Sequence, residues 1–203
     1  SIICKIYTES HGLQSFIVNG VRKSKNSQLS IFQPLNQLDL IFYMKKNSTL
    51  HRIKESKIYK IYKSLHYEIP KISICFFLSE FLIKVLTPEE DQNKKFEFIS
   101  KSIQDFDKIV KDYNDFHVKF LIKLSHHFGI GISNHLQLTV YSNSDTLVTR
   151  YIENCINDDY DIITKSNNIL RNKVINLIIE YYKTNLDINF NINSNDVLNK
   201  IFK

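Results

Sequence analysis

Clusters of basic side chains are the residues whose type and spacing point most directly to chemistry. Arg22, Lys23 and Lys25 follow Gly20 in a segment that also contains serine and asparagine, so we expect them on an exposed loop. Positive charges on such a loop can contact phosphates. This cluster predicts an anionic partner, and nucleic acid is the first candidate.

Two more basic clusters lie in the first third of the chain: Lys45 and Lys46 at the end of a predicted strand, and Arg52, Lys54 and Lys57 within the next predicted strand. Residues two apart on an extended strand point to the same side, so Arg52 and Lys54 are predicted to share a face. Tyr43, Phe16 and Phe32 are candidate base-stacking side chains. For the two phenylalanines, packing in the core is the favoured interpretation.

The positive charge is concentrated in residues 1–65, which carry eleven Lys or Arg against three acids. The other 138 residues carry sixteen against eighteen, and the whole chain has a net charge of +6. This asymmetry is typical of proteins that contact nucleic acid or an anionic surface. The alternative is that these lysines only keep the surface hydrated.

Motifs of common enzyme classes are missing from the sequence. It contains no GxxxxGK[ST], GxGxxG, GxSxG or HExxH, and only four glycines. Asp158, Asp159 and Asp161 could chelate a divalent cation as in a nuclease, but a solvated acidic cluster is the favoured interpretation. We therefore expect a protein that is not an enzyme and that has no cofactor and no metal.

Cysteine usage and hydropathy indicate the compartment. Cys4, Cys75 and Cys155 are too few and too far apart for a disulfide framework, so we expect reduced thiols. The apolar run 72–86 is interrupted by charges and is too short to cross a bilayer. These features predict a cytoplasmic protein that does not bind a membrane.

Periodicity predicts an α+β fold that changes character near Pro70. Alternating apolar residues indicate strands over 2–8, 13–19, 38–43 and, more weakly, 50–59. Helical spacing follows over 72–86, from a start between Thr87 and Lys94 to about 113, over 116–128, over 170–182 and after Ser194. We thus predict a small β-barrel or sandwich at 1–65 and a helical domain at 66–203, with an irregular insert around 132–165.

Three segments resemble the N-terminal domain of the bacterial recombination mediator family RecO: HGLQSFIVNGVRKSK (11–25), IFQPLNQLDLIFY (31–43) and LHRIKESK (50–57). The resemblance implies an OB-fold barrel followed by a helical domain. Arg22, Lys23, Lys25, Arg52 and Lys54 match basic positions of the family's barrel. Family members usually carry another strand before the segment where this chain begins, so we expect a barrel open on that side.

What the resemblance implies about function is recombinational DNA repair without catalytic turnover. Proteins of this family bind single- and double-stranded DNA, anneal strands, contact RecR and the single-strand-binding protein, and help RecA to load. A cytoplasmic, nucleoid-associated location follows. Many members hold zinc through clustered cysteines in the later domain, but residues 132–165 contain only Cys155, so zinc is not expected. The alternative is an interaction adaptor whose basic domain binds acidic protein tails.

Overall fold

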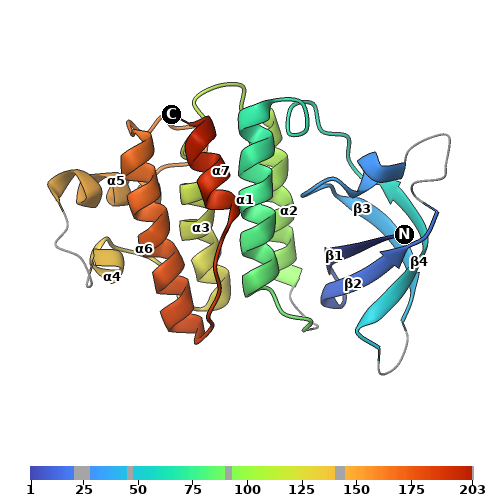
Figure 1. Ribbon diagram of the computed structural model, residues 1–203. Helices are drawn as coiled ribbons and strands as arrows, with labels where there is room; N and C mark the ends of the chain where they lie inside the picture. The colour runs from blue at the N-terminus through green and yellow to red at the C-terminus, as the bar shows by residue number, and fades with distance from the viewer. Residues whose placement is uncertain (21–27, 45–47, 90–92, 140–144, 203) are drawn as a thin grey trace. The chain divides into compact units, whose positions relative to one another are not determined.

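The computed structural model describes residues 1–20, 28–44, 48–89, 93–139 and 145–202 (Figure 1). Its contacts group the chain into two compact units, Ser1–Ser100 and Lys101–Lys203. The domain boundary at residue 65 falls between the last strand and the first helix and stays a prediction. The α+β class is confirmed, because a sheet is followed by helices.

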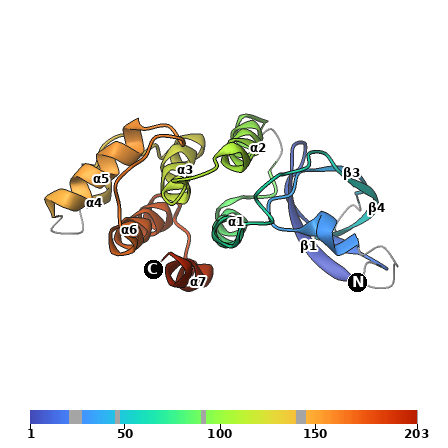
Figure 2. The ribbon, with the colours of Figure 1, turned by 90° about the horizontal axis from the view of Figure 1, so that it is seen from above.

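The first unit contains a four-stranded sheet of β1 (Ile2–Thr8), β2 (Gly12–Val18), β3 (Leu38–Tyr43) and β4 (Leu50–Ile58). Its order is β1-β2-β4-β3, with β2 parallel to β4 and the other pairs antiparallel. The strand predictions are confirmed. Among the described residues the sheet is not closed, and β1 and β3 are its edges (Figure 2). A short 3₁₀ helix, η1 (Gln28–Phe32), lies between β2 and β3 in the chain.

The inner face of this sheet is apolar and aromatic. Phe16 on β2 is fully buried, and its ring centre lies 4.9 Å from that of Phe42 on β3 in an edge-to-face arrangement. The buried His51 ring on β4 lies 5.9 Å from Phe16. Because strand side chains alternate between faces, burying this set leaves the other side chains on the outer face.

The turn between β1 and β2 requires glycine. Gly12 has φ +61°, and a Cβ at this position would lie 2.5 Å from the carbonyl oxygen of Glu89. The Thr8 hydroxyl donates to the Gly12 carbonyl (3.0 Å), and the Leu13 amide donates to the carbonyl of Thr87 (2.9 Å). The tight turn therefore fixes β1 and β2 against residues 87–89.

Helices α1 (Ile69–Val85) and α2 (Asn93–Lys108) follow the sheet. Pro70 lies in the first turn of α1, where its missing amide costs no hydrogen bond. For α2 the sequence indicated a start between Thr87 and Lys94. The helix begins at Asn93, and Thr87 and Pro88 are not helical.

The second unit is helical throughout its regular structure. It contains α3 (Phe116–Ser125), the 3₁₀ helix η2 (His126–Phe128), α4 (Leu136–Thr139), α5 (Thr146–Asn157), α6 (Asn168–Leu186) and α7 (Ser194–Ile201). Gly129 ends η2 with φ +73°, the left-handed conformation that glycine commonly adopts after a helix. Among the described residues no helix has the length and apolar character of a membrane span.

The prediction of an irregular insert at 132–165 is wrong. Residues 146–157 form helix α5, in which Val148, Tyr151, Ile152 and Cys155 are buried. These positions have the spacing of one helical face. The Asp145 carboxylate accepts a hydrogen bond from the Leu147 amide (3.2 Å) and caps the helix. The polar residues around this face concealed its period.

Candidate nucleic-acid interface

The structure describes three of the eight predicted DNA-binding side chains. Arg52, Lys54 and Lys57 lie on β4, and all three are exposed. The other five lie outside the described residues: Arg22, Lys23, Lys25, Lys45 and Lys46. The geometry of the candidate interface is therefore the geometry of β4 and the strands beside it.

A β-bulge interrupts β4 at Lys54. Ile53 pairs with Phe42 on β3 and Glu55 pairs with Ile41, which leaves Lys54 as the extra residue. Arg52 and Lys54 are both exposed, with half-buried Ile53 between them, so the burial pattern agrees with the prediction that these two side chains share a face, which stays a prediction. Beyond the bulge, Glu55 and Lys57 occupy the outward positions.

The register aligns one outward residue from each strand in a row across the sheet. Ile3 on β1 pairs with Ile17 on β2, Ile17 pairs with Arg52 on β4, and Arg52 pairs with Tyr43 on β3. Directly paired residues project from the same face. We call these four residues the outer row. With strands about 4.8 Å apart, the row spans about 14 Å.

The ends of the outer row are apolar and accessible. Ile3 is 68% exposed and Tyr43 is 58% exposed, and Arg52 between them is also exposed. Next to this row, Lys5 on β1 pairs with Ser15 on β2, and Lys5 is exposed as well. An isoleucine and a tyrosine with this exposure, placed beside cations, suit a ligand that has both flat rings and negative charge.

Acidic side chains accompany two of the three cations on β4. Lys57 Nζ lies 3.3 Å from Asp39 Oδ2 across the β3–β4 pair, and Lys54 Nζ lies 3.8 Å from Glu55 Oε1. Among the residues that the structure describes, Arg52 has no acidic partner within ion-pair distance. Arg52 is thus the β4 cation whose charge no acid in this part of the chain neutralises.

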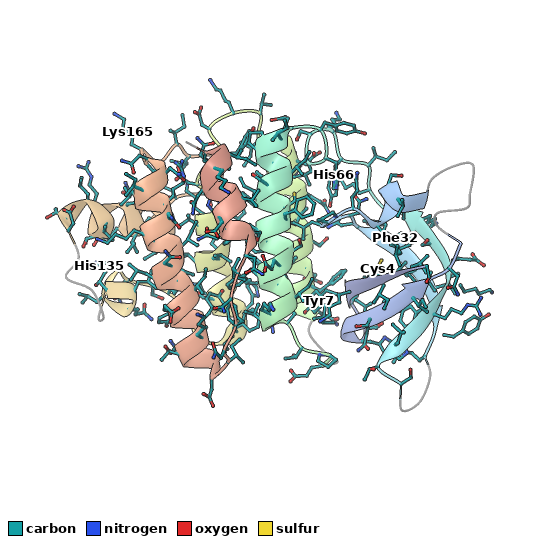
Figure 3. All side chains as sticks on the ribbon, in the orientation of Figure 1. Cys4, Tyr7, Phe32, His66, His135 and Lys165 are labelled. Carbon is teal, nitrogen blue, oxygen red and sulfur yellow. The ribbon has the colours of Figure 1, made fainter. Side chains whose placement is uncertain are left out.

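The aromatic candidates separate by burial. Phe16 belongs to the core and Tyr43 is exposed, whereas Phe32, which is labelled in Figure 3, is half-buried. Core packing of Phe16, the favoured interpretation, is confirmed. Of these three side chains, Tyr43 is the one whose ring a base could reach.

The far end of the outer face is covered. Tyr7 on β1, which is labelled in Figure 3, has its ring centre 5.8 Å from that of Phe96 on α2. Burial raises the pKa of the Tyr7 hydroxyl to about 12, so the phenol stays neutral. Cys4 projects to the inner face beside Phe16, and burial raises the pKa of its thiol. The face is therefore open around Ile3 and Tyr43 and closed around Tyr7.

Sequence reasoning missed Ile3, Ile17 and Lys5 as members of this surface. Each lies on a strand that was predicted, and alternation alone places the three on one side of the β1–β2 hairpin. Their position beside Arg52 depends on the parallel pairing of β2 with β4, whose partners are about 35 residues apart. No local signal in the sequence reveals that pairing.

The acidic residues after α5 serve the fold in this structure. Asp158 accepts a hydrogen bond from the Thr164 hydroxyl (3.1 Å), and Asp159 lies 3.7 Å from Lys123 Nζ. The buried Lys119 ammonium donates to the carbonyls of Asp159 (2.8 Å) and Ile162 (2.7 Å). These contacts anchor the segment to α3.

Metal-ligating side chains do not gather in the part of the chain that the structure describes. No group of three or more His, Cys, Asp or Glu residues there could hold an ion. Cys155 is buried on α5, and burial raises the pKa of its thiol to about 12, which disfavours the thiolate that zinc requires. The residues present therefore do not fit a zinc site of clustered cysteines.

The chain is similar to known DNA repair proteins. The family model described as "Recombination protein O N terminal" matches residues 1–62. The DNA repair protein RecO of Christiangramia forsetii is 29% identical over 223 aligned positions, which cover 99% of this chain and 92% of that protein. RecO of Azobacteroides pseudotrichonymphae is also 29% identical, over 98% of this chain and 91% of that protein. RecO of Phocaeicola vulgatus is 34% identical over 131 aligned positions, which cover 64% of this chain and 54% of that protein.

Proposed function

We propose that the chain is a member of the RecO family of DNA repair proteins, to which it is similar over nearly its whole length, and that it is a non-catalytic mediator of recombination. In this proposal it binds single- and double-stranded DNA, anneals complementary strands, and assists RecA loading together with RecR. The single-strand-binding protein is the further partner. The names of the relatives support the repair assignment, and the chemistry of the first unit supports the DNA contact.

The observation that carries the proposal is the outer face of the sheet. Arg52 lies at its centre without an acidic partner among the described residues, and exposed Tyr43 lies beside it. Guanidinium groups bind phosphate through several donors, and tyrosine rings stack on bases. The other seven predicted residues, five of which lie outside the described part of the chain, would extend this surface.

The proposed mechanism of annealing is charge neutralisation. Lysine and arginine side chains reduce the repulsion between two phosphate backbones, so complementary bases can pair without being read by the protein. A surface that neutralises about six phosphates would lose affinity by about three powers of ten between about 50 and 200 mM salt. Binding would be independent of base sequence, because phosphate contacts carry no sequence information.

We also propose that residues 1–65 form the DNA-binding domain and residues 66–203 the helical domain. Association with the nucleoid in the cytoplasm would follow from binding to DNA of any sequence. The net charge of residues 1–65 supports this division, since eleven of the 27 basic residues lie there with only three acids.

The experiment is fluorescence anisotropy of a labelled mixed-sequence oligonucleotide, titrated with the protein at several salt concentrations and followed by annealing in the same samples. We expect salt-sensitive, sequence-independent binding and faster annealing. Replacing Arg22, Lys23 and Lys25 by glutamine should weaken binding to every sequence alike. Tighter binding of an acidic peptide than of DNA at equal ionic strength would favour the adaptor instead.

A further inference from the structure

The outer row has a composition that differs from that of a duplex-binding surface. Its members are two isoleucines, a tyrosine and one arginine, and the two end residues, Ile3 and Tyr43, are more than half exposed. A double helix presents phosphates and keeps the faces of its bases stacked inside. Exposed apolar side chains gain little from such a ligand.

The charges around the outer row also disfavour a duplex ligand. Asp39 and Glu55 project from the outer face beside Lys57 and Lys54, and each lies within 4 Å of its lysine. Carboxylates in these positions repel a second phosphate backbone. Arg52 remains to bind a phosphate near the centre of the row, which suits one strand better than two.

A single strand can use the apolar and aromatic side chains of the outer row, which a duplex cannot. Its unpaired bases have free faces that stack on aromatic rings, and its backbone passes one phosphate at a time across a cation. The Tyr43 ring is adjacent to Arg52 across the β3–β4 pair, so one nucleotide can use both side chains. Ile17 and Ile3 continue the apolar surface toward β1.

We infer that the outer row makes the first unit selective for single-stranded over double-stranded DNA, with Tyr43 stacking on an unpaired base while Arg52 binds the neighbouring phosphate. This inference rests on the proposed DNA-binding function. It assigns the selectivity to the sheet and leaves duplex binding to basic residues outside the row. Tyr43 is then the residue that determines the preference.

The test compares Tyr43→Ala and Tyr43→Phe with the unchanged chain, using a single strand and a duplex of the same sequence. Loss of one stacked base should weaken single-strand binding about tenfold and leave duplex binding within about twofold. Tyr43→Phe keeps the ring and should restore single-strand affinity. Quenching of 2-aminopurine in the single strand should fall with Tyr43→Ala and return with Tyr43→Phe.

Tyr67→Ala is the matched control, because Tyr67 is 75% exposed and lies outside the sheet, between β4 and α1. It should leave both affinities unchanged, and circular dichroism checks that each variant folds. Equal losses for single strand and duplex with Tyr43→Ala, or no loss for either, would overturn the inference while DNA binding stands. Absence of DNA binding by the unchanged chain would instead overturn the proposed function and the inference with it.

Discussion

Replacing Asp39 by asparagine should strengthen DNA binding. Asp39 lies 3.3 Å from Lys57 Nζ across the β3–β4 pair, and the two side chains are 49% and 78% exposed. The substituted amide would keep the shape of the side chain but remove the charge that holds Lys57. The lysine could then contact a phosphate, and one source of repulsion on the outer face would be gone.

The size of the effect follows from this geometry. An exposed ion pair contributes about 0.2–1 kcal/mol, so freeing Lys57 should tighten binding to a single strand about 1.4- to 5-fold at moderate salt. One additional phosphate contact should steepen the slope of log affinity against log salt by about 0.7. Fluorescence anisotropy at four or more salt concentrations measures both quantities. In the double variant Asp39→Asn with Lys57→Gln, the slope of log affinity against log salt should be no steeper than in the unchanged chain.

Asp105→Asn is the matched control in the second unit. Asp105 lies 2.7 Å from Lys108 Nζ in an exposed pair, so this change alters net charge and frees one lysine in the same way. We expect it to have little effect on DNA affinity. If Asp105→Asn strengthened binding as much as Asp39→Asn, net charge alone would explain the result. If Asp39→Asn left the salt slope unchanged, the reasoning about the outer face would be refuted.

Three further predictions concern stability. Gly12→Ala should lower the free energy of unfolding by about 2–3 kcal/mol in urea titrations, because φ is +61° and the new Cβ would lie 2.5 Å from the Glu89 carbonyl oxygen. Gly20→Ala is the control, because φ is +77° but the space around it is open, and it should lower the free energy of unfolding by only about 1–2 kcal/mol. If the two variants lost equal stability, the clash would not contribute. Lys119→Met should lower the free energy of unfolding by about 1.5–3 kcal/mol, since the carbonyls of Asp159 and Ile162 lose their charged donor, and a neutral effect in the same titration would argue against this anchor. Burial lowers the pKa of His117 to about 3 from an ordinary value near 6.5, so the unfolded chain binds the proton first as pH falls. The free energy of unfolding should therefore decline below pH 6.5 by up to about 1.4 kcal/mol per pH unit. His117→Asn should make that decline smaller when thermal melts at pH 7 and pH 5 are compared.

Local patterns predicted the elements of this fold well, and long-range pairing set the limit. Alternating apolar residues indicated β1 and β2, and helical spacing over 116–128 indicated α3 and η2. Helix α5 was missed because its four buried residues lie among polar ones, and Asp145 was not recognised as its cap.

The candidate site shows the same limit. Arg52, Lys54 and Lys57 could be chosen from charge alone, yet their neighbours could not. The bulge at Lys54 and the parallel pairing of Ile17 with Arg52 arise from how the strands meet, and neither has a sequence signature in a single chain. Asp39 was visible in the sequence as an acid, but its position opposite Lys57 depends on strand register.

The most direct test of the account is an NMR titration of the isotope-labelled chain with a mixed-sequence single strand. The account predicts that amide signals of the outer row (Ile3, Ile17, Arg52 and Tyr43) shift on binding, and that raising the salt reverses the shifts. Shifts confined to residues 101–203, with the outer row unaffected, would contradict the claim that the sheet of the first unit binds DNA.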